Sequence, residues 1–222
     1  MQTTTYGRTR IVLPHVEDEL HPAGTVPTSG KLADFVFTTP QVRHLAMSDG
    51  RLLGGRVTGS EAQRVTFDRV RLESLFIEDV SWTSAQLTDC TLSRVVFRRC
   101  KLLGTRFVAT RFSNVVFEDC RLEYADLDRV VSEGPVVFVR TLVNETTFSD
   151  CRFPGGAMTE CELKSVTFAG GDYVDFDVRG TDLTTVRGAA SLSGTLITPE
   201  QRYQLAEALV NELDLRYPED DA

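Results

Sequence analysis

One stretch of the sequence decides the fold: LSRVVFRRCKLLGTRFVATRFSNVVFEDCRLEYADL, residues 92–127. A large apolar residue stands at every fifth position, beginning with Leu92, Phe97 and Leu102. Apolar residues repeat about every 3.6 residues on one side of a helix and every two on one side of a strand, so this period fits neither a long helix nor a flat sheet. The stretch predicts a repeat protein in which each unit adds one inward-pointing side chain to a shared core.

The five-residue period extends well beyond this stretch in both directions. The column of central residues continues without a break through Phe67, Leu72, Ile77, Trp82, Leu87, Leu92, Phe97, Leu102, Phe107, Phe112, Phe117, Leu122 and Leu127. The column two residues earlier is small or β-branched almost throughout, as at Val65 and Thr105. Looser repeats begin at Leu32. After an irregular stretch over residues 128–137, the pattern resumes one residue out of phase at Phe138 and continues to Leu183.

Single units also have a recognisable form. Val65-Thr66-Phe67-Asp68-Arg69 and Ala125-Asp126-Leu127-Asp128-Arg129 resemble tandem pentapeptide repeats, which usually read as a small residue, Asp or Asn, Leu or Phe, and two polar residues. The resemblance covers residues 32–197 and implies a right-handed quadrilateral β-helix with four pentapeptides in each coil. An independent rhythm supports coils of this size: the position before the central residue is apolar at Phe76, Val96 and Val116, which stand 20 residues apart.

The chain therefore divides into three parts, and its fold class is all-β with a short C-terminal α-helix. We expect an N-terminal arm or cap over residues 1–31, the β-helix over 32–197 with its phase break at 128–137, and an amphipathic helix over 198–217. Thr198-Pro199-Glu200-Gln201 has the order of a helix start, with a capping Thr and a Gln three residues later. The helix either caps the last coil or, as the family resemblance implies, joins two protomers into a homodimer through Leu205, Leu209 and Leu213.

The cysteines predict structure rather than chemistry. All five stand in the small-residue column, at Cys90, Cys100, Cys120, Cys151 and Cys161. We interpret them as buried apolar fillers with reduced thiols, although Cys100 and Cys120 should stack close together. The sequence has no nucleophile motif, phosphate loop or zinc spacing. We therefore expect no enzyme activity, no catalytic residue, no metal and no cofactor.

The charge limits the partner. The formal net charge is −8, and it is unevenly placed. Residues 1–140 carry 18 Lys and Arg against 17 Asp and Glu, whereas residues 141–222 carry 6 against 15, a net charge of −9. An acidic protein makes a poor nucleic-acid binder, because phosphate contacts need clustered Lys and Arg. No apolar run could cross a membrane, and the first residues lack a signal peptide, so we expect a cytoplasmic protein with a protein partner.

The family resemblance suggests which partner. Quinolone-resistance members of the pentapeptide-repeat family imitate DNA and bind DNA gyrase or topoisomerase IV, protecting them from drugs. On that basis the candidate contacts are acidic residues of the later coils: Glu160, Glu162, Asp172, Asp175, Asp177 and Asp182. The alternative is a general protein-interaction scaffold that does not bind topoisomerases.

The 20-residue rhythm also defines two outward rows. Phe76, Val96 and Val116, extended by Val137, form an apolar row that is either a partner surface or a surface covered by the N-terminal segment around Ile11. Glu78-Asp79, Arg98-Arg99 and Glu118-Asp119 alternate in sign at the coil spacing. Opposite charges on adjacent strands attract, so we interpret this second row as structural.

Overall fold

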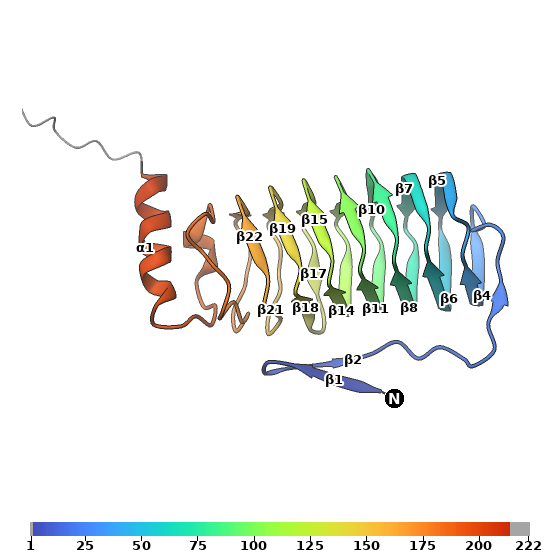
Figure 1. The fold of residues 1–222 in the computed structure, drawn as a ribbon, viewed down its shortest axis with the longest axis horizontal. Coiled ribbons are helices and arrows are strands. Elements are labelled where there is room, and N and C mark those ends of the chain that lie inside the picture. Colours follow the sequence, from blue (N-terminus) through green and yellow to red (C-terminus); the bar gives the residue numbers. More distant parts are fainter. Residues whose placement is uncertain (1, 214–222) are drawn as a thin grey trace, which may run out of the picture.

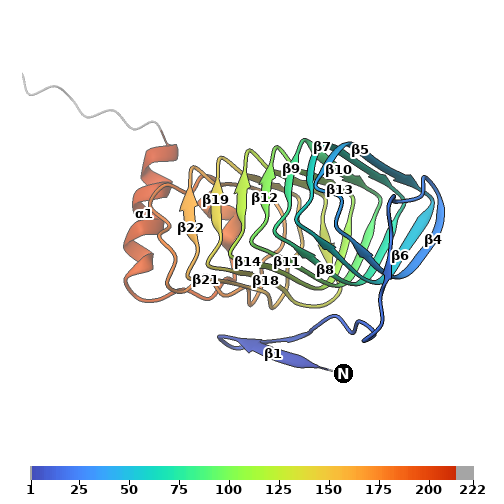
Figure 2. The same ribbon diagram turned by 45° about the vertical axis from the view of Figure 1, so that its right-hand side comes forward.

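Parallel strands stack coil upon coil along one axis and build a rod with a helix across one end (Figures 1 and 2). The computed structural model describes residues 2–213. Residues one coil apart are paired: Val95 lies beside Leu75 on one side and Val115 on the other. The predicted fold, a right-handed quadrilateral β-helix with a short C-terminal α-helix, is confirmed.

Each coil has four faces, which we number 1 to 4 in chain order. In the middle of the rod their inward residues are Phe112, Phe117, Leu122 and Leu127, all buried. Faces 1 and 2 belong to a nine-stranded sheet. Its strands are β3 (His21–Pro22), β4 (Gly30–Phe37), β6 (Gly50–Thr58), β8 (Arg71–Glu78), β11 (Thr91–Arg98), β14 (Arg111–Glu118), β17 (Val131–Ser132), β18 (Val136–Val139) and β21 (Ala157–Thr159).

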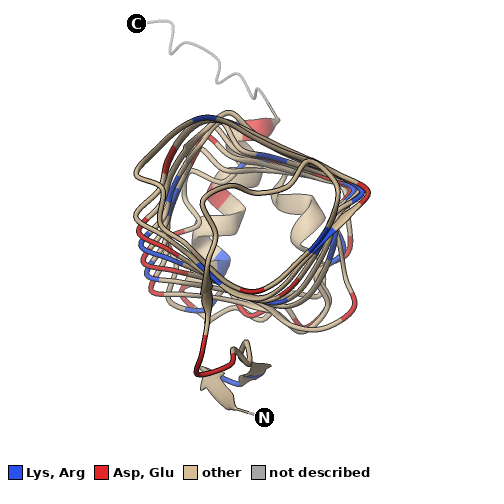
Figure 3. Ribbon diagram, turned by 90° about the vertical axis from the view of Figure 1, so that its right-hand side faces the viewer, with Lys and Arg blue, Asp and Glu red and all other residues tan. Residues whose placement is uncertain are grey.

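Faces 3 and 4 belong to a twelve-stranded sheet. Its strands are β5 (Gln41–Ser48), β7 (Glu61–Asp68), β9 (Ser81–Thr83), β10 (Ala85–Thr88), β12 (Lys101–Leu103), β13 (Arg106–Val108), β15 (Arg121–Glu123), β16 (Asp126–Asp128), β19 (Leu142–Asn144), β20 (Thr147–Ser149), β22 (Glu162–Lys164) and β23 (Thr167–Ala169). Figure 3 shows the four-sided cross-section down the axis, with charged residues in rows along its rim.

Aromatic rings stack along the axis inside the coils. Phe97, Phe117 and Phe138 occupy successive coils of face 2, with ring centroids 4.8 and 4.9 Å apart and nearly parallel planes. This separation is the spacing of neighbouring strands, so the stacking follows directly from the coil register. Rings from adjacent faces meet edge to face, as Phe107 and Phe112 do. The central column predicted from the sequence is therefore the core.

The five cysteines are buried and free, as the column predicted. The thiol of Cys100 donates to the carbonyl oxygens of Ile77 and Arg98 at 3.2 and 3.3 Å. Thr110 makes the same two contacts with its hydroxyl, at 3.1 and 3.2 Å. Cysteine and threonine thus have the same role in this column: each side chain donates to backbone carbonyl oxygens at a corner of the coil. Burial raises the pKa of Cys90 to about 11, which keeps the thiol protonated.

The corners require a left-handed backbone, which the sequence analysis did not foresee. The second residue after the central one has a positive φ at corner after corner, including Ala109 at 50° and Tyr124 at 55°. Residues other than glycine, asparagine and aspartate rarely adopt this region. Gly104 occupies one corner at 61° with open space around it. The stacking of the coils therefore holds the backbone of these corner residues in a strained conformation.

The phase break is a one-residue insertion at a single corner. Phe112 pairs with Ser132, 20 residues later, whereas Val115 pairs with Val136, 21 residues later. The extra residue lies between these points. Ser132 points inward where other coils place a large residue, and its hydroxyl is buried without a hydrogen-bond partner.

Helix α1 (Gln201–Glu212), preceded by a 3-10 turn over Ala189–Leu192, closes the last coil. Thr198 and Gln201 bond to each other at this point: Thr198 N–H donates to Gln201 Oε1 at 2.8 Å, and Gln201 N–H donates to Thr198 Oγ1 at 3.4 Å. The helix itself begins at Gln201, three residues after the predicted capping residue Thr198. The Gln201 amide also donates to the Val178 and Thr181 carbonyls at 2.7 and 2.8 Å. These bonds satisfy carbonyls that no further coil pairs. The end of the expected helix range, 214–217, lies outside the described residues.

At the other end, the N-terminal arm covers both the first coil and one side of the rod. β3 pairs with β4, and Ala23 and Val26 pack against the core. Before them, β1 (Thr3–Tyr6) and β2 (Thr9–Val12) form an antiparallel hairpin. Figures 1 and 2 show this hairpin outside the coils, running along the rod rather than along the coil strands.

Candidate functional site

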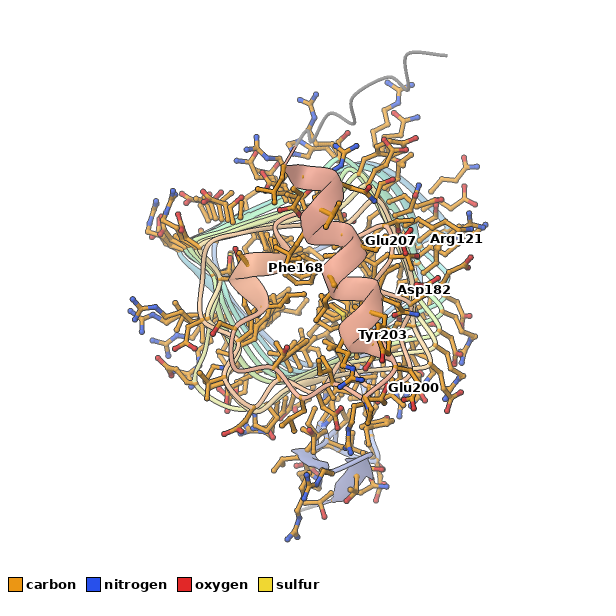
Figure 4. The ribbon with its side chains drawn as sticks, turned by 90° about the vertical axis from the view of Figure 1, so that its left-hand side faces the viewer. Arg121, Phe168, Asp182, Glu200, Tyr203 and Glu207 are labelled. Atoms are coloured by element: carbon orange, nitrogen blue, oxygen red, sulfur yellow. The ribbon has the colours of Figure 1, made fainter. Side chains whose placement is uncertain are left out.

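Three of the six predicted acidic contacts come together on face 3, near the end that α1 closes. Glu160, Glu162 and Asp182 line one surface hollow of about 680 Å³, together with Lys164 and Thr185. All three carboxylates are exposed. Figure 4 shows Asp182 on the same side of the rod as Glu207 of α1. Lys164 Nζ lies 2.7 Å from Glu162 Oε1, so one of the three charges is partly neutralised.

Two other predicted acids lie away from this hollow. Asp172 and Asp175 flank the inward residue Tyr173, on face 1 and its following corner. Both are exposed. Asp172 Oδ1 accepts the N–H of Val174 at 3.2 Å, a bond that shapes its own turn. The six acids are therefore distributed around the rod rather than gathered on one surface.

Asp177 is the exception, and its assignment as an exposed partner contact is wrong. Its side chain is buried, and it holds the Arg179 guanidinium through two bonds of 2.8 and 2.6 Å. The hydrogen bonds from Arg179 lower the pKa of this carboxyl below its ordinary value. Asp177 belongs to the outward column of face 2, one coil beyond Ala157.

The apolar row on face 2 is covered by the N-terminal hairpin. Val96 and Val116 are 1% and 0% exposed, and both pack in a small cluster around Ile11, which is itself fully buried. Phe76 is half-buried at the edge of this cluster, with the Arg56 guanidinium carbon 4.5 Å from its ring centroid. These three residues are therefore not free partner contacts in this structure. Of the two interpretations of the row, the N-terminal cover is the one observed.

Val137, Val139 and Ala157 continue the covered surface toward the C-terminal end. The hairpin is fixed to this surface mainly by side chains. Val12 N–H donates to Asn114 Oδ1 at 2.8 Å, and Thr9 Oγ1 donates to the Gly155 carbonyl at 3.4 Å. The sequence analysis missed Asn114 as an anchor because asparagine is also an ordinary choice for a left-handed corner.

The alternating charges on the outer edge of face 2 pair from coil to coil. Arg98 bonds Glu78 at 3.0 Å and Glu118 at 2.8 Å, while Arg140 bonds Glu118 at 2.9 Å. Arg99 and Asp79 form a parallel pair at 2.7 Å. The structural interpretation of this row is confirmed. Its charges neutralise one another and leave little net field on this edge.

Helix α1 divides the predicted oligomer residues. Leu205 is half-buried and packs against the core. Leu209 and Leu213 are 39% and 65% exposed. Tyr203 and Val210 are exposed beside them. The outer side of the end cap is therefore more apolar than a capping role requires.

Two other kinds of feature are absent from residues 2–213. This part of the chain contains no group of three or more His, Cys, Asp or Glu side chains arranged to hold a metal ion. Within the same residues, no helix has the length and apolar character needed to span a membrane.

A family model for pentapeptide repeats in nine copies matches residues 87–131. Those residues form the coils whose 20-residue register and inward columns are described above. Residues 87–131 therefore match the pentapeptide-repeat family. No curated protein matches it.

Solved pentapeptide-repeat structures are similar at low sequence identity. A trypsin-treated variant of QnrB1, a plasmid-mediated fluoroquinolone resistance protein, is 14% identical over 86% of this chain and 100% of its own, with a TM-score of 0.44. Full-length QnrB1 is 16% identical over 68% and 91% of the two chains, with a TM-score of 0.28. HetL, involved in heterocyst differentiation regulation in the cyanobacterium Nostoc sp. strain PCC 7120, is 11% identical over 74% and 86%, with a TM-score of 0.26.

Proposed function

We propose that this chain is a non-enzymatic rod that binds another protein through the acidic surface of its last coils, and that the partner is DNA gyrase or topoisomerase IV. One observation carries the proposal: residues 141–222 hold a net charge of −9, and Glu160, Glu162 and Asp182 are exposed around one hollow in that region. A rod with regularly spaced carboxylates imitates the phosphates of a duplex to a protein that binds DNA. Such a partner requires a cytoplasmic location.

The arginines of the middle coils do not oppose this proposal as strongly as their number suggests. Arg98 and Arg99 are held by carboxylates of neighbouring coils at 2.7 to 3.0 Å. Paired charges produce a weak field at a distance, and salt screens what remains within about 10 Å. The unpaired carboxylates near α1 therefore dominate the long-range attraction of a cationic partner.

A supercoiling assay tests the proposal. Purified protein is expected to inhibit gyrase supercoiling at micromolar concentration. Glu160→Lys, Glu162→Lys and Asp182→Lys together should raise the inhibitory concentration at least tenfold. The matched control reverses the same number of charges in the N-terminal arm, with Glu17→Lys, Asp18→Lys and Glu19→Lys, and should retain inhibition. Normal supercoiling in the presence of the unmodified chain would exclude a gyrase partner and favour a general interaction scaffold.

Two protomers are proposed to join through the outer side of α1. Leu209 and Leu213 lie there with Tyr203 and Val210, and an exposed apolar group of this kind commonly marks a protein contact. End-to-end pairing would double the length of the rod. Sedimentation should give a homodimer that Leu209→Glu with Leu213→Glu converts to a monomer of unchanged fold. A monomer in both samples would exclude this interface.

A further inference from the structure

Face 3 carries charges of opposite sign at its two ends. Strands β9, β12, β19 and β22 of this face follow one another along the rod in Figure 2. Arg43 and Arg64 lie on its first two coils, and Glu160, Glu162 and Asp182 lie on its last two; all five are exposed. Within residues 2–213, neither arginine forms an ion pair, and neither do Glu160 and Asp182. Unlike the charged edge of face 2, this face therefore has charges available at both ends.

The middle of face 3 is apolar. Leu102 and Leu122 stand at the midpoint of its inward row, with three inward residues of the same face before them and three after them. Beside them on the outside, Leu103 and Tyr124 are 41% and 56% exposed. Gly104 occupies the corner of Tyr124 one coil earlier, and a Cβ added to it would meet no atom within 4 Å. A protruding aromatic residue and an open position thus lie one coil apart.

This order of charges is complementary to itself when the rod is reversed. A two-fold axis through the midpoint, parallel to the strands, sets the coils of face 3 against those of a second copy in reverse order. The first coil then meets the last, which brings Arg43 to the coil of Asp182. The second coil meets the last but one, which brings Arg64 to the coil of Glu162. Because the axis repeats every contact, opposite charges meet at both ends of the face.

The same axis matches the apolar middle. It places Tyr124 of each copy against the open corner at Gly104 of the other, since these two corners lie one coil apart on either side of the axis. Leu103 lies beside this contact. A buried tyrosine at the centre of an interface is a common source of binding energy. Shape and charge therefore select the same arrangement.

The remaining charges of face 3 are compatible with this arrangement. Glu61, the acidic residue of the first end, meets the coil of Lys164. Lys101 and Arg121 come near each other across the axis, where Glu123, 2.9 Å from Arg121, offsets them. The acidic end by itself would suit any cationic partner. A face with a basic end, an apolar middle and an acidic end in this order is matched by its own reverse.

The size of face 3 sets the strength of such a contact. Its coils extend about 34 Å along the rod at the spacing of stacked strands, and one strand with its corner is about 13 Å wide. The two copies together would bury about 900 Å², which is at the low end for a specific interface. Charges in such an interface fix the orientation of the partners more than they add affinity. We therefore expect a weak, reversible dimer with one defined orientation.

We propose that face 3 is an interaction surface for a second copy of this chain, in which two rods lie side by side and antiparallel, with Arg43 and Arg64 of each against the acidic end of the other. The interface is separate from α1. It covers Glu160, Glu162 and Asp182, so a dimer of this kind competes with any other partner of the acidic end. It does not rest on the proposed topoisomerase partner, because only this chain's own residues form it.

Sedimentation equilibrium of the full-length chain tests the pairing. Every sample carries Leu209→Glu and Leu213→Glu, which removes association through α1. This background chain should form a reversible dimer over a concentration series that reaches several hundred micromolar. The matched control adds Arg51→Glu and Arg152→Glu, which reverse two exposed arginines of face 1, and should dimerise as the background chain does.

Charge exchange between the two ends gives the decisive comparison. One variant carries Arg43→Glu with Arg64→Glu, and a second carries Glu162→Lys with Asp182→Lys. Each alone sets like charges against each other at both ends, so its dissociation constant should rise at least tenfold. An equal mixture of the two variants restores opposite charges at both ends and should form a heterodimer. One chain carrying all four substitutions should recover the homodimer for the same reason.

Three results would overturn the proposal. The background chain could stay monomeric throughout the series, in which case face 3 does not pair. The mixture and the chain with all four substitutions could stay as weak as the single variants, in which case the two ends do not face each other. The face 1 control could weaken the dimer equally, in which case only total charge matters. None of these measurements uses gyrase, so each leaves the topoisomerase proposal to its own assay.

Discussion

Face 2 and face 4 share one backbone geometry and differ in what lies outside them. Inward, both are lined by large apolar residues, such as Phe97 on face 2 and Phe107 on face 4. Outward, face 2 carries Val96 and Val116, whereas the matching positions of face 4 carry Thr66, Gln86, Arg106, Asp126 and Thr147. The hairpin covers the first column and solvent meets the second. The inward residues thus specify the coil, and the outward residues differ according to whether the hairpin or solvent contacts the face.

The largest expected loss of stability comes from truncating an inward aromatic residue, and it should be the same on both faces. Phe97→Ala and Phe107→Ala should each lower the free energy of unfolding by about 3–5 kcal/mol, because each opens a cavity in the stacked core. Urea denaturation followed by circular dichroism measures the loss. Cys100→Ala removes a smaller group and should cost far less. Equal losses from Phe97→Ala and Cys100→Ala would contradict the separation of the two inward columns.

The next largest loss of stability should occur on face 2 and not on face 4, when a charge is placed in the outward column. Val116→Asp places a charge beneath the hairpin and should release it, at a cost of about 2–3 kcal/mol. The matched change on face 4, Gln86→Asp, lies in solvent and should alter stability by less than about 0.5 kcal/mol. Limited proteolysis of residues 15–20 reads out the release directly. Equal cleavage of the two variants would mean that the hairpin does not protect this face.

The charged edges should also differ. Arg98 joins two carboxylates that are themselves largely buried, at 13% and 14% side-chain exposure, whereas Arg106 meets the more exposed Asp126 at 3.3 Å. Arg98→Ala should therefore cost about 1–2 kcal/mol, because it leaves Glu78 and Glu118 without this partner. Arg106→Ala should cost less than about 0.5 kcal/mol. Thermal melts at low and high salt should separate the two, and similar values would remove the distinction between the edges.

A smaller effect tests the corners common to both faces. Gly104→Ala and Ala109→Gly are opposite substitutions at two left-handed corners with open or solvent-facing surroundings. The first should lose about 1 kcal/mol, and the second should gain up to about 0.5 kcal/mol as relief of strain exceeds the added chain entropy. Paired denaturation curves measure both. A loss from Ala109→Gly would show that entropy outweighs strain at these corners.

The smallest effect is a pH dependence on the edge of face 2. Hydrogen bonds from Arg140 lower the pKa of Asp119 below its ordinary value. A depressed carboxyl pKa stabilises the folded chain fully above the ordinary aspartate value of about 3.9, and this stabilisation is lost as the pH falls through the lower folded value. NMR titration should place the pKa of Asp119 below the ordinary aspartate value, and Asp119→Asn should flatten the acid limb of stability. An ordinary titration of Asp119 would contradict the ion pair.

The sequence was most informative where one physical rule repeats. Residues at intervals of five point inward because every pentapeptide turns the chain by one face, and thirteen positions in phase leave little freedom for another fold. The cysteine column was predictable for the same reason. The left-handed corners were not, because Ala109, Tyr124 and Arg129 give no local signal for a positive φ. Stacking against neighbouring coils imposes that geometry, and intrinsic preference does not.

The candidate surfaces were harder to predict than the core. The apolar character of Val96 and Val116 was plain in the sequence, but not whether a partner or the chain's own hairpin covers them. The burial of Asp177 and the half-burial of Leu205 were not predictable, because a carboxylate or a leucine near the surface points in or out according to its tertiary neighbours. Arg179 and the last coil decide those two cases.

By itself, the sequence determined the period, the inward columns, the coil size, the pairing of Thr198 with Gln201 ahead of the helix and the concentration of negative charge in the last third of the chain. These are properties of order along the chain, and a solenoid converts such order directly into position because each coil contacts mainly its neighbours. Only the tertiary structure decided that the hairpin lies on face 2, that Asp177 is buried and that Leu205 turns inward. Those contacts join residues far apart in sequence, and no periodic rule specifies them.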